Sequence, residues 1–145
     1  MTTFATNPRA TFDYQILETI EAGLKLTGHE VKAVKAGKCS LRGSYVKTSG
    51  TDLILIGATI SPYQPSNLPP DYEPDRSIQL LIKKSESKKL AQELETAGLT
   101  LVPLKLYSKN NLVKLEIGLA RGKKKYDKRE SIKKREFERK EKRGA

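Results

Sequence analysis

The sequence is poor in the residues from which catalytic and metal sites are built. Its 145 residues include one cysteine, Cys39, and one histidine, His29, and no carboxylates cluster at the spacing of metal ligands. A single cysteine excludes an intrachain disulfide and a cysteine metal cluster. No base stands near Cys39 in the sequence to activate it as a nucleophile. We therefore expect a binding protein without cofactor or metal, and an enzyme is the least expected class.

Long apolar runs are also missing. The most apolar segment is Leu53–Ile56, far short of the roughly 20 residues that cross a bilayer. The N-terminus lacks the basic start and apolar middle of a signal peptide. A basic protein of this kind, with a formal net charge of +11, most often binds nucleic acid. We expect a cytoplasmic monomer with RNA as its partner and no membrane partner.

Charge is concentrated at the C-terminus. Residues 121–145 hold 13 Lys/Arg against 5 Asp/Glu, whereas residues 1–120 hold 15 against 12. This division predicts a folded body, 1–120, and a basic tail, 121–145, that is disordered when free and helical on a polyanion. A cap-like start at Asp127 and Glu-to-Lys pairs four residues apart favour the helix. The alternative is a charged run that only aids solubility.

Alternating apolar residues predict about six strands in the body. They lie at 14–20, 40–47, 52–60, 77–83, 99–107 and 112–119, with hairpin turns at 48–51 and 110–111. Tyr14, Ile16 and Ile20 are expected on one face of the first strand, which Glu21-Ala22-Gly23 interrupts. Residues 1–8 are expected to be frayed. Many short strands in one domain indicate an antiparallel barrel.

Two short helices complete the expected body. The first, 28–36, begins at a capping box formed by Thr27 and Glu30 and ends at Gly37; the second, 85–97, ends at Gly98. Residues 61–77 hold five of the seven prolines and are expected to form a surface loop.

Several motifs, each weak alone, resemble in their order and spacing the small protein B family, the SsrA-binding proteins that partner bacterial tmRNA. They include Asn7-x-Arg9-Ala10, Glu21-Ala22-Gly23-Leu24, Ala36-Gly37-Lys38, Leu104-x-Leu106-Tyr107, Gly122-Lys123-Lys124 and Asp127-Lys128-Arg129. The resemblance implies a barrel like the oligonucleotide-binding (OB) fold that grips the tRNA-like domain of tmRNA. It also implies a tail that enters the decoding centre and empty mRNA channel of a ribosome stalled on mRNA without a stop codon, which enables trans-translation.

The resemblance and the charge pattern give candidate RNA contacts. The expected tmRNA contacts on the body are Asn7, Arg9, Tyr14, Glu21, Lys32, Lys35, Arg76 and Leu81. The expected ribosomal RNA contacts in the tail are Gly122, Lys123, Lys124, Tyr126, Asp127, Lys128, Arg129, Ile132, Lys133, Arg135 and Phe137. Glu21 is expected to accept a hydrogen bond from a base edge or a 2′-hydroxyl.

Two other classes of function are alternatives for this sequence. A general RNA-binding or ribosome-assembly protein with a basic extension would have the same charge distribution. A membrane-surface protein would use the tail as an amphipathic helix, but Ile132 and Phe137 lie five residues apart and form no apolar stripe.

Overall fold

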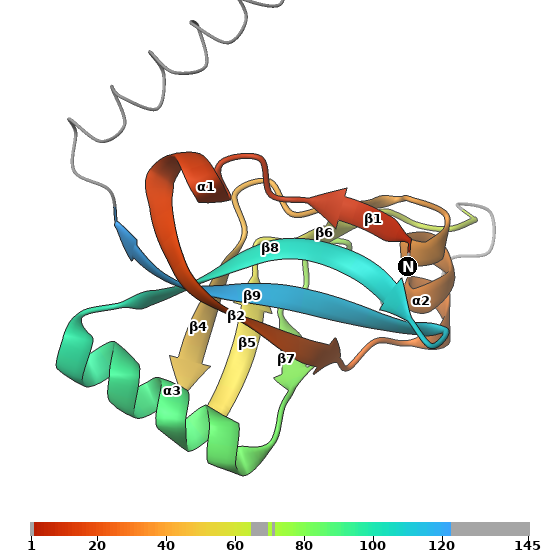
Figure 1. The fold of residues 1–145 in the computed structure, drawn as a ribbon. Coiled ribbons are helices and arrows are strands. Elements are labelled where there is room, and N and C mark those ends of the chain that lie inside the picture. The colour runs from red at the N-terminus through yellow and green to blue at the C-terminus, as the bar shows by residue number, and fades with distance from the viewer. Residues whose placement is uncertain (1, 65–69, 71, 123–145) are drawn as a thin grey trace, which may run out of the picture.

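An antiparallel sheet dominates the computed structural model, which describes residues 2–64, 70 and 72–122 (Figure 1). Seven strands lie in the order β1-β8-β9-β2-β7-β5-β4, and β3 and β6 form a separate pair. The strands are β1 (Thr3–Thr6), β2 (Tyr14–Leu24), β3 (Cys39–Ser40), β4 (Tyr45–Ser49), β5 (Asp52–Ile56), β6 (Thr59–Ile60), β7 (Ile78–Leu81), β8 (Thr100–Lys109) and β9 (Leu112–Gly122). The helices are α1 (Ala10–Asp13), α2 (Gly28–Lys35) and α3 (Lys84–Ala97).

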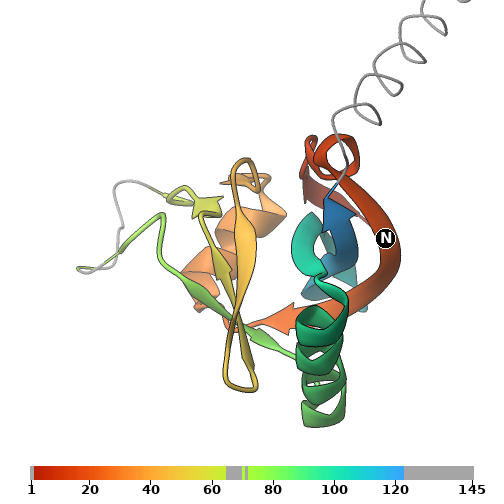
Figure 2. The ribbon, with the colours of Figure 1, turned by 90° about the vertical axis from the view of Figure 1, so that its left-hand side faces the viewer.

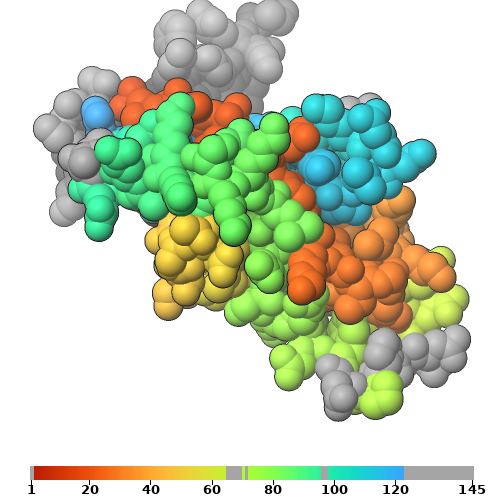
Figure 3. Space-filling model, turned by 90° about the horizontal axis from the view of Figure 1, so that it is seen from below, coloured from red at the N-terminus to blue at the C-terminus, as the bar shows by residue number. Residues whose placement is uncertain are grey.

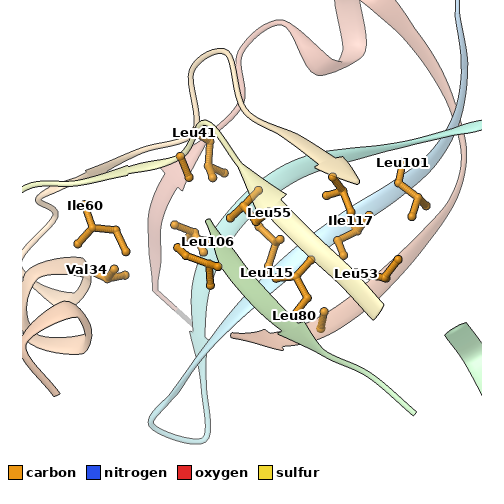
Figure 4. Packing of buried hydrophobic residues seen from close by; sticks show 14 of the residues in the cluster. Val34, Leu41, Leu53, Leu55, Ile60, Leu80, Leu101, Leu106, Leu115 and Ile117 are labelled. Atoms are coloured by element: carbon orange, nitrogen blue, oxygen red, sulfur yellow. The ribbon is translucent and has the colours of Figure 1, made fainter. Parts of the chain in front are cut away.

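The sheet curls so that its two ends face each other (Figure 2). Strands β4, β5 and β7 form one wall and β2, β8 and β9 the other, and β4 packs against β8. The core lies between the walls, where Leu55, Leu115 and Ile117 are fully buried (Figure 4). The mainly β, OB-like class is confirmed. The barrel does not close its edges as expected, because in the described residues no ladder joins β1 to β4.

The helix signals in the sequence are confirmed by backbone and side-chain contacts. Thr27 Oγ1 accepts from the Glu30 backbone N–H at 3.2 Å, and the Thr27 N–H donates to Glu30 Oε1 at 2.9 Å, which is a complete capping box. Gly37 follows the C-cap with φ +79°, and Gly98 ends α3 with φ +64°. Glycine adopts these left-handed angles at little cost, so both helices end where the sequence predicts.

Three residues with positive φ mark the places where strands turn or end. Asn110 and Asn111 have φ of 53° and 63°, as the tight β8–β9 hairpin requires. Gly57, at φ +82°, splits the predicted strand 52–60 into β5 and β6. A Cβ on Gly57 would lie 3.1 Å from the carbonyl oxygen of Gly43, so the backbones approach too closely there for a side chain.

Several expected elements differ in the structure. Residues 3–6 are not frayed but form β1, because they pair with β8 and the Ser108 N–H donates to the Thr2 carbonyl at 2.8 Å. The predicted strand 40–47 is divided between the end of β3 and the start of β4, which continues to Ser49 into the predicted turn, and α1 is a third helix that was not predicted. Strand β2 continues through residues 21–23, where the absence of a side chain on Gly23 lets Leu81 approach.

Candidate nucleic-acid interface

Strand β2 contains a bulge that changes which of its side chains face outward. In the register with β9, Ile16 lies opposite Ala120 and Glu18 lies opposite Leu119, so Leu17 is an extra residue. A bulge of this kind reverses the alternation of the residues that follow it relative to those that precede it. The faces of β2 therefore have to be assigned separately on the two sides of Leu17.

This bulge overturns the expectation that Tyr14, Ile16 and Ile20 share a face. Tyr14 and Ile16 pack in a small outer cluster beneath α1, whereas Ile20 packs against the main core. Tyr14 and Glu21, seven residues apart, lie on the same outer face because of the extra residue. They lie at opposite ends of β2, about 20 Å apart at the rise of an extended strand.

Four adjacent strands present two rows of residues on this outer face, the side of the sheet away from the core. In the first row each residue lies opposite the next across the β7–β2, β2–β9 and β9–β8 ladders; its members, in order, are Leu81, Gly23, Lys114 and Tyr107. The second row crosses β2, β9 and β8; its members, in order, are Glu21, Glu116 and Lys105. The same strands adjoin on the surface, where β7 is green, the end of β2 orange-red and the β8–β9 hairpin cyan to blue (Figure 3). We name as the cross-strand strip the residues Leu81, Gly23, Lys114, Tyr107, Glu21, Glu116 and Lys105.

Two donors on β8 hold the carboxylate of Glu21. The Tyr107 hydroxyl donates to Glu21 Oε2 at 2.5 Å, and Lys109 Nζ donates to the same oxygen at 3.3 Å. The hydrogen bond from Tyr107 is the main reason that the pKa of Glu21 lies below its usual value; burial opposes it, and Lys109 and Lys114 reinforce it. Burial and the hydrogen bond to Glu21 raise the pKa of the Tyr107 hydroxyl. At neutral pH the pair is an anionic acceptor and a neutral donor.

Leu81 stands beside this carboxylate with 53% of its surface exposed. Both residues line a depression of about 510 Å³, whose other charged lining residues are Lys83, Lys84, Lys114, Asp52 and Glu86. The depression thus combines an apolar contact, a hydrogen-bond acceptor and cations. These are the groups that contact the base or ribose, the polar edge and the phosphate of a nucleotide.

The other predicted contacts on β2 and before it lie at the far end of the strand. Asn7, Arg9 and Tyr14 line a separate depression of about 390 Å³, together with the exposed ring of Tyr45. The Asn7 side-chain amide donates to the Pro103 carbonyl at 3.0 Å, which fixes the turn between β1 and α1. The sequence grouped these residues with Glu21, but the structure places them apart.

Arg9 and Tyr14 lie where the chain passes from α1 into β2. The Arg9 guanidinium lies 4.9 Å from the centre of the Phe12 ring and 3.6 Å from the Asp13 carboxylate. Tyr14 lies opposite Gly122, the last described residue of the chain. The tail therefore leaves the body beside this second depression. The predicted tail contacts from Lys123 onward lie outside the described residues.

The two predicted lysines of α2 are exposed, as expected. Lys35 Nζ donates to the Asn111 carbonyl at 3.1 Å, so α2 lies beside the tip of the β8–β9 hairpin. Lys32 lies on the same short helix. Both cations thus lie near the β8–β9 hairpin, on the side of the body that contains the cross-strand strip and away from Tyr14.

Arg76 is part of a structural ion pair. Its guanidinium donates to the Glu30 carboxylate at 2.6 and 2.8 Å and to the Lys25 and Ser77 carbonyls. Burial raises the pKa of Glu30, and the hydrogen bonds from Arg76 and Thr27 more than offset that effect, so the pKa lies below its usual value. This guanidinium anchors the loop before β7 to α2.

Comparison with known proteins identifies the family to which this chain belongs. A family model described as "SmpB protein" matches residues 4–145. The chain belongs to the SmpB family. The resemblance found in the sequence motifs is thereby confirmed, and it extends over the body and the tail.

Relatives within the SmpB family cover most of the chain. The SsrA-binding protein of Streptococcus mutans serotype c is 48% identical over 135 residues, 93% of this chain and 86% of that protein. The SsrA-binding protein of Microcystis aeruginosa is 49% identical over 133 residues, 92% of this chain and 86% of that protein. A solved structure described as "tmRNA-SmpB: a journey to the center of the bacterial ribosome" is similar with a TM-score of 0.66 and 41% identity, over 88% of this chain and 92% of that chain.

Sequence reasoning missed three residues that the structure brings to Glu21, namely Tyr107, Lys109 and Lys114. The alternation of β9 contained part of the signal, because it predicts that Lys114 points away from the core. Nothing local predicts that β8 and β2 place Tyr107 against Glu21, 86 residues away. The SmpB-family motif around Leu104 to Tyr107 includes the tyrosine without giving its role.

None of the helices that the structure describes has the length and apolar composition needed to cross a membrane. Within the described ranges, no three His, Cys, Asp or Glu side chains are grouped to hold a metal ion.

Proposed function

We propose that this member of the SmpB family is a tmRNA-binding adaptor that delivers tmRNA to ribosomes stalled on mRNA without a stop codon and enables trans-translation. The observation that carries the proposal is the similarity to SmpB in a structure described as tmRNA-SmpB in the bacterial ribosome, which spans 88% of this chain. In this role the protein binds and positions RNA and performs no chemical reaction. It acts as a monomer in the cytoplasm, where its RNA partners are.

The body, residues 1–120, holds the tRNA-like domain of tmRNA. The end of the body that contains the cross-strand strip is suited to this role, because Glu21 and Leu81 lie there within reach of several lysines. Lys32 and Lys35 extend the cationic surface along α2. Arg76 contributes mainly by anchoring the loop, since its guanidinium already donates to Glu30, Lys25 and Ser77.

Asn7, Arg9 and Tyr14 extend the RNA contact to the other end of β2. An RNA that reaches both groups must follow the outer face for about 20 Å, roughly the length of seven extended residues. Between the two groups the side chains of Ile16 and Leu104 cover Gly118 of β9, so the RNA would pass over an apolar part of the face. We propose that the tRNA-like domain contacts the strip first and these residues second.

The basic tail, residues 121–145, is assigned to the ribosome. Its excess of basic residues, 13 Lys/Arg against 5 Asp/Glu, suits a channel lined with phosphates. We propose that Gly122, Lys123, Lys124, Tyr126, Asp127, Lys128 and Arg129 contact the decoding centre, and that Ile132, Lys133, Arg135 and Phe137 belong to a helix in the mRNA channel. Because Gly122 lies opposite Tyr14, the tail starts at the end of the body away from the strip.

A competition assay tests this function. The full chain is bound to a labelled tRNA-like-domain transcript and challenged with unlabelled transcript or with an unrelated structured RNA of equal length, at one fixed salt concentration. We expect the unrelated RNA to compete at least on the order of tenfold less well, since polar contacts add to phosphate attraction. Equal competition would instead identify a general RNA-binding protein with a basic extension.

A further inference from the structure

We propose that Tyr107 is a positioning residue for RNA recognition, whose hydroxyl orients the Glu21 carboxylate to accept a hydrogen bond from a 2′-hydroxyl or a base N–H of the bound RNA. The inference rests on the proposed function and adds to it a residue and a recognition chemistry. In this role Glu21 selects RNA groups that donate hydrogen bonds, on a surface that otherwise attracts phosphate.

The geometry fixes one carboxylate oxygen and leaves the other for a ligand. Tyr107 and Lys109 both donate to Glu21 Oε2. Among the described residues, Oε1 receives no hydrogen bond, and 37% of the Glu21 side chain is exposed. An ionised carboxylate accepts and cannot donate, so the ligand group has to be a donor. RNA offers such donors in its 2′-hydroxyls and in the amino and imino groups of its bases.

Tyr107 is suited to positioning because its ring cannot move freely. Only 4% of the residue is exposed, and Lys105 Nζ lies 5.5 Å from the centre of the ring. A ring confined in this way presents its hydroxyl at one place. Lys109, by contrast, is an exposed side chain with several rotatable bonds, and its contact with Glu21 at 3.3 Å is longer. The hydroxyl is therefore the main determinant of where the carboxylate points.

The charges around Glu21 explain why an acceptor is placed there. Lys109 contacts it from β8, and Lys114 and Glu116 lie near it on β9. Lys83, Lys84, Glu86 and Asp52 line the same depression, and Lys105 is paired with Glu116 at 3.6 Å. These cations attract any polyanion without regard to its structure. A fixed carboxylate among them repels a phosphate that approaches it and favours a neutral donor. Glu21 thus contributes selectivity rather than overall attraction.

A double-mutant cycle on the full chain tests the role of Tyr107. The variants Tyr107→Phe, Glu21→Gln and the double variant are compared for binding to the tRNA-like-domain transcript, with thermal unfolding confirming that each is folded. We expect Tyr107→Phe to weaken binding about fivefold, the size of one lost hydrogen bond. In the Glu21→Gln background the same change is expected to alter binding by less than about twofold. An equal loss in both backgrounds would overturn the proposal.

A pH profile provides a readout that a merely structural role would not change. The hydrogen bond from Tyr107 lowers the pKa of Glu21, so its removal raises that pKa. Because the proposed contact needs the ionised form, binding by Tyr107→Phe should begin to weaken at a higher pH than binding by the wild type as the solution is acidified. Tyr72→Phe is the matched control, since the Tyr72 hydroxyl donates at 2.5 Å to the Ile60 carbonyl. Its profile should match that of the wild type, and a wild-type profile for Tyr107→Phe would contradict the proposal.

The same measurements separate failure of the inference from failure of the proposed function. If the wild type prefers the tRNA-like transcript but the cycle is additive, only the role of Tyr107 is wrong. If the wild type shows no preference, both are wrong. Transcripts with 2′-fluoro in place of 2′-hydroxyl groups identify the donor. If wild type and Glu21→Gln bind the 2′-fluoro transcript with equal affinity, the donor to Glu21 is a 2′-hydroxyl. If their affinities still differ, the donor is a base N–H.

Discussion

Glu30 and Arg76 form an ion pair that joins α2 to the segment before β7, with two hydrogen bonds of 2.6 and 2.8 Å. The Glu30 side chain is 3% exposed and that of Arg76 is 33% exposed. The same carboxylate accepts the capping hydrogen bond from Thr27. One buried carboxylate therefore stabilises both the start of α2 and the loop that precedes β7.

Removal of the guanidinium should destabilise the fold. We expect Arg76→Met to lower the free energy of unfolding by about 2 kcal/mol, less than for a fully buried pair because Arg76 is partly exposed. This corresponds to a decrease of about 5 °C in Tm for a chain of this size, measured by circular dichroism. Arg42→Met, which removes an exposed guanidinium, is the control and should change Tm by less than about 1 °C. Equal effects of the two variants would contradict the structural role of Arg76.

The same pair should make stability depend on pH. The folded-state pKa of Glu30 lies below its ordinary value of 4.5, so the pair contributes stability above that value and loses it as the pH falls through the folded-state pKa. Glu30→Gln keeps a side chain that can complete the capping box but removes the charge. In urea denaturation, the difference between wild type and Glu30→Gln should be largest near pH 7 and should shrink below about pH 4.5. A difference that does not vary with pH would refute this account.

Gly57 should be the least replaceable glycine of the β4–β5–β6 region. At φ +82° an added Cβ meets the Gly43 carbonyl oxygen at 3.1 Å and the Ser44 Cα at 3.3 Å. We expect Gly57→Ala to cost about 2–3 kcal/mol in urea denaturation, from strained backbone and steric conflict together. Gly50→Ala is matched in backbone angle, φ +63°, but has open space around it, and should cost about 1 kcal/mol. A cost for Gly50→Ala as large as that for Gly57→Ala would show that the close contact is unimportant.

Leu81 should contribute to RNA binding and little to stability. With 53% of its surface exposed beside Glu21, it offers an apolar contact for a base or ribose. We expect Leu81→Ala to weaken binding of the tRNA-like domain about fivefold, equivalent to about 1 kcal/mol of lost apolar contact. Leu112→Ala, at the β8–β9 hairpin and 58% exposed, should leave binding within about twofold. Equal binding by the two variants would exclude Leu81 from the interface.

The elements that sequence reasoning predicted correctly are those whose determinants are local. The capping box of Thr27 and Glu30, the glycines at 37 and 98, and the paired asparagines at 110 and 111 each act within a few residues. The uneven charge of body and tail is likewise visible without coordinates. The fold class follows from these signals together with the alternation of the strands.

The differences arise where distant parts of the chain determine the structure. β1 is short and polar and is ordered by pairing with β8, about 100 residues later. The bulge at Leu17 reverses the faces of β2, and no local signal places it there. The candidate site depends on the order β7-β2-β9-β8, which brings Leu81, Glu21 and Tyr107 together from three separate strands. Residue types alone could name Glu21 and Leu81 but not the tyrosine that holds the carboxylate.

In the proposed function the body binds one RNA, while the tail, which begins at the end of β2 away from the cross-strand strip, binds a second. The most direct test is to remove the tail after Gly122, which keeps the pairing of Gly122 with Tyr14. The shortened chain is compared with the full chain for its preference for the tRNA-like domain over unrelated RNA, and for nascent-chain tagging in a reconstituted translation system. We predict a preference unchanged within about threefold, weaker binding to all RNA at low salt, and no tagging. Loss of the preference for the tRNA-like domain would contradict the account.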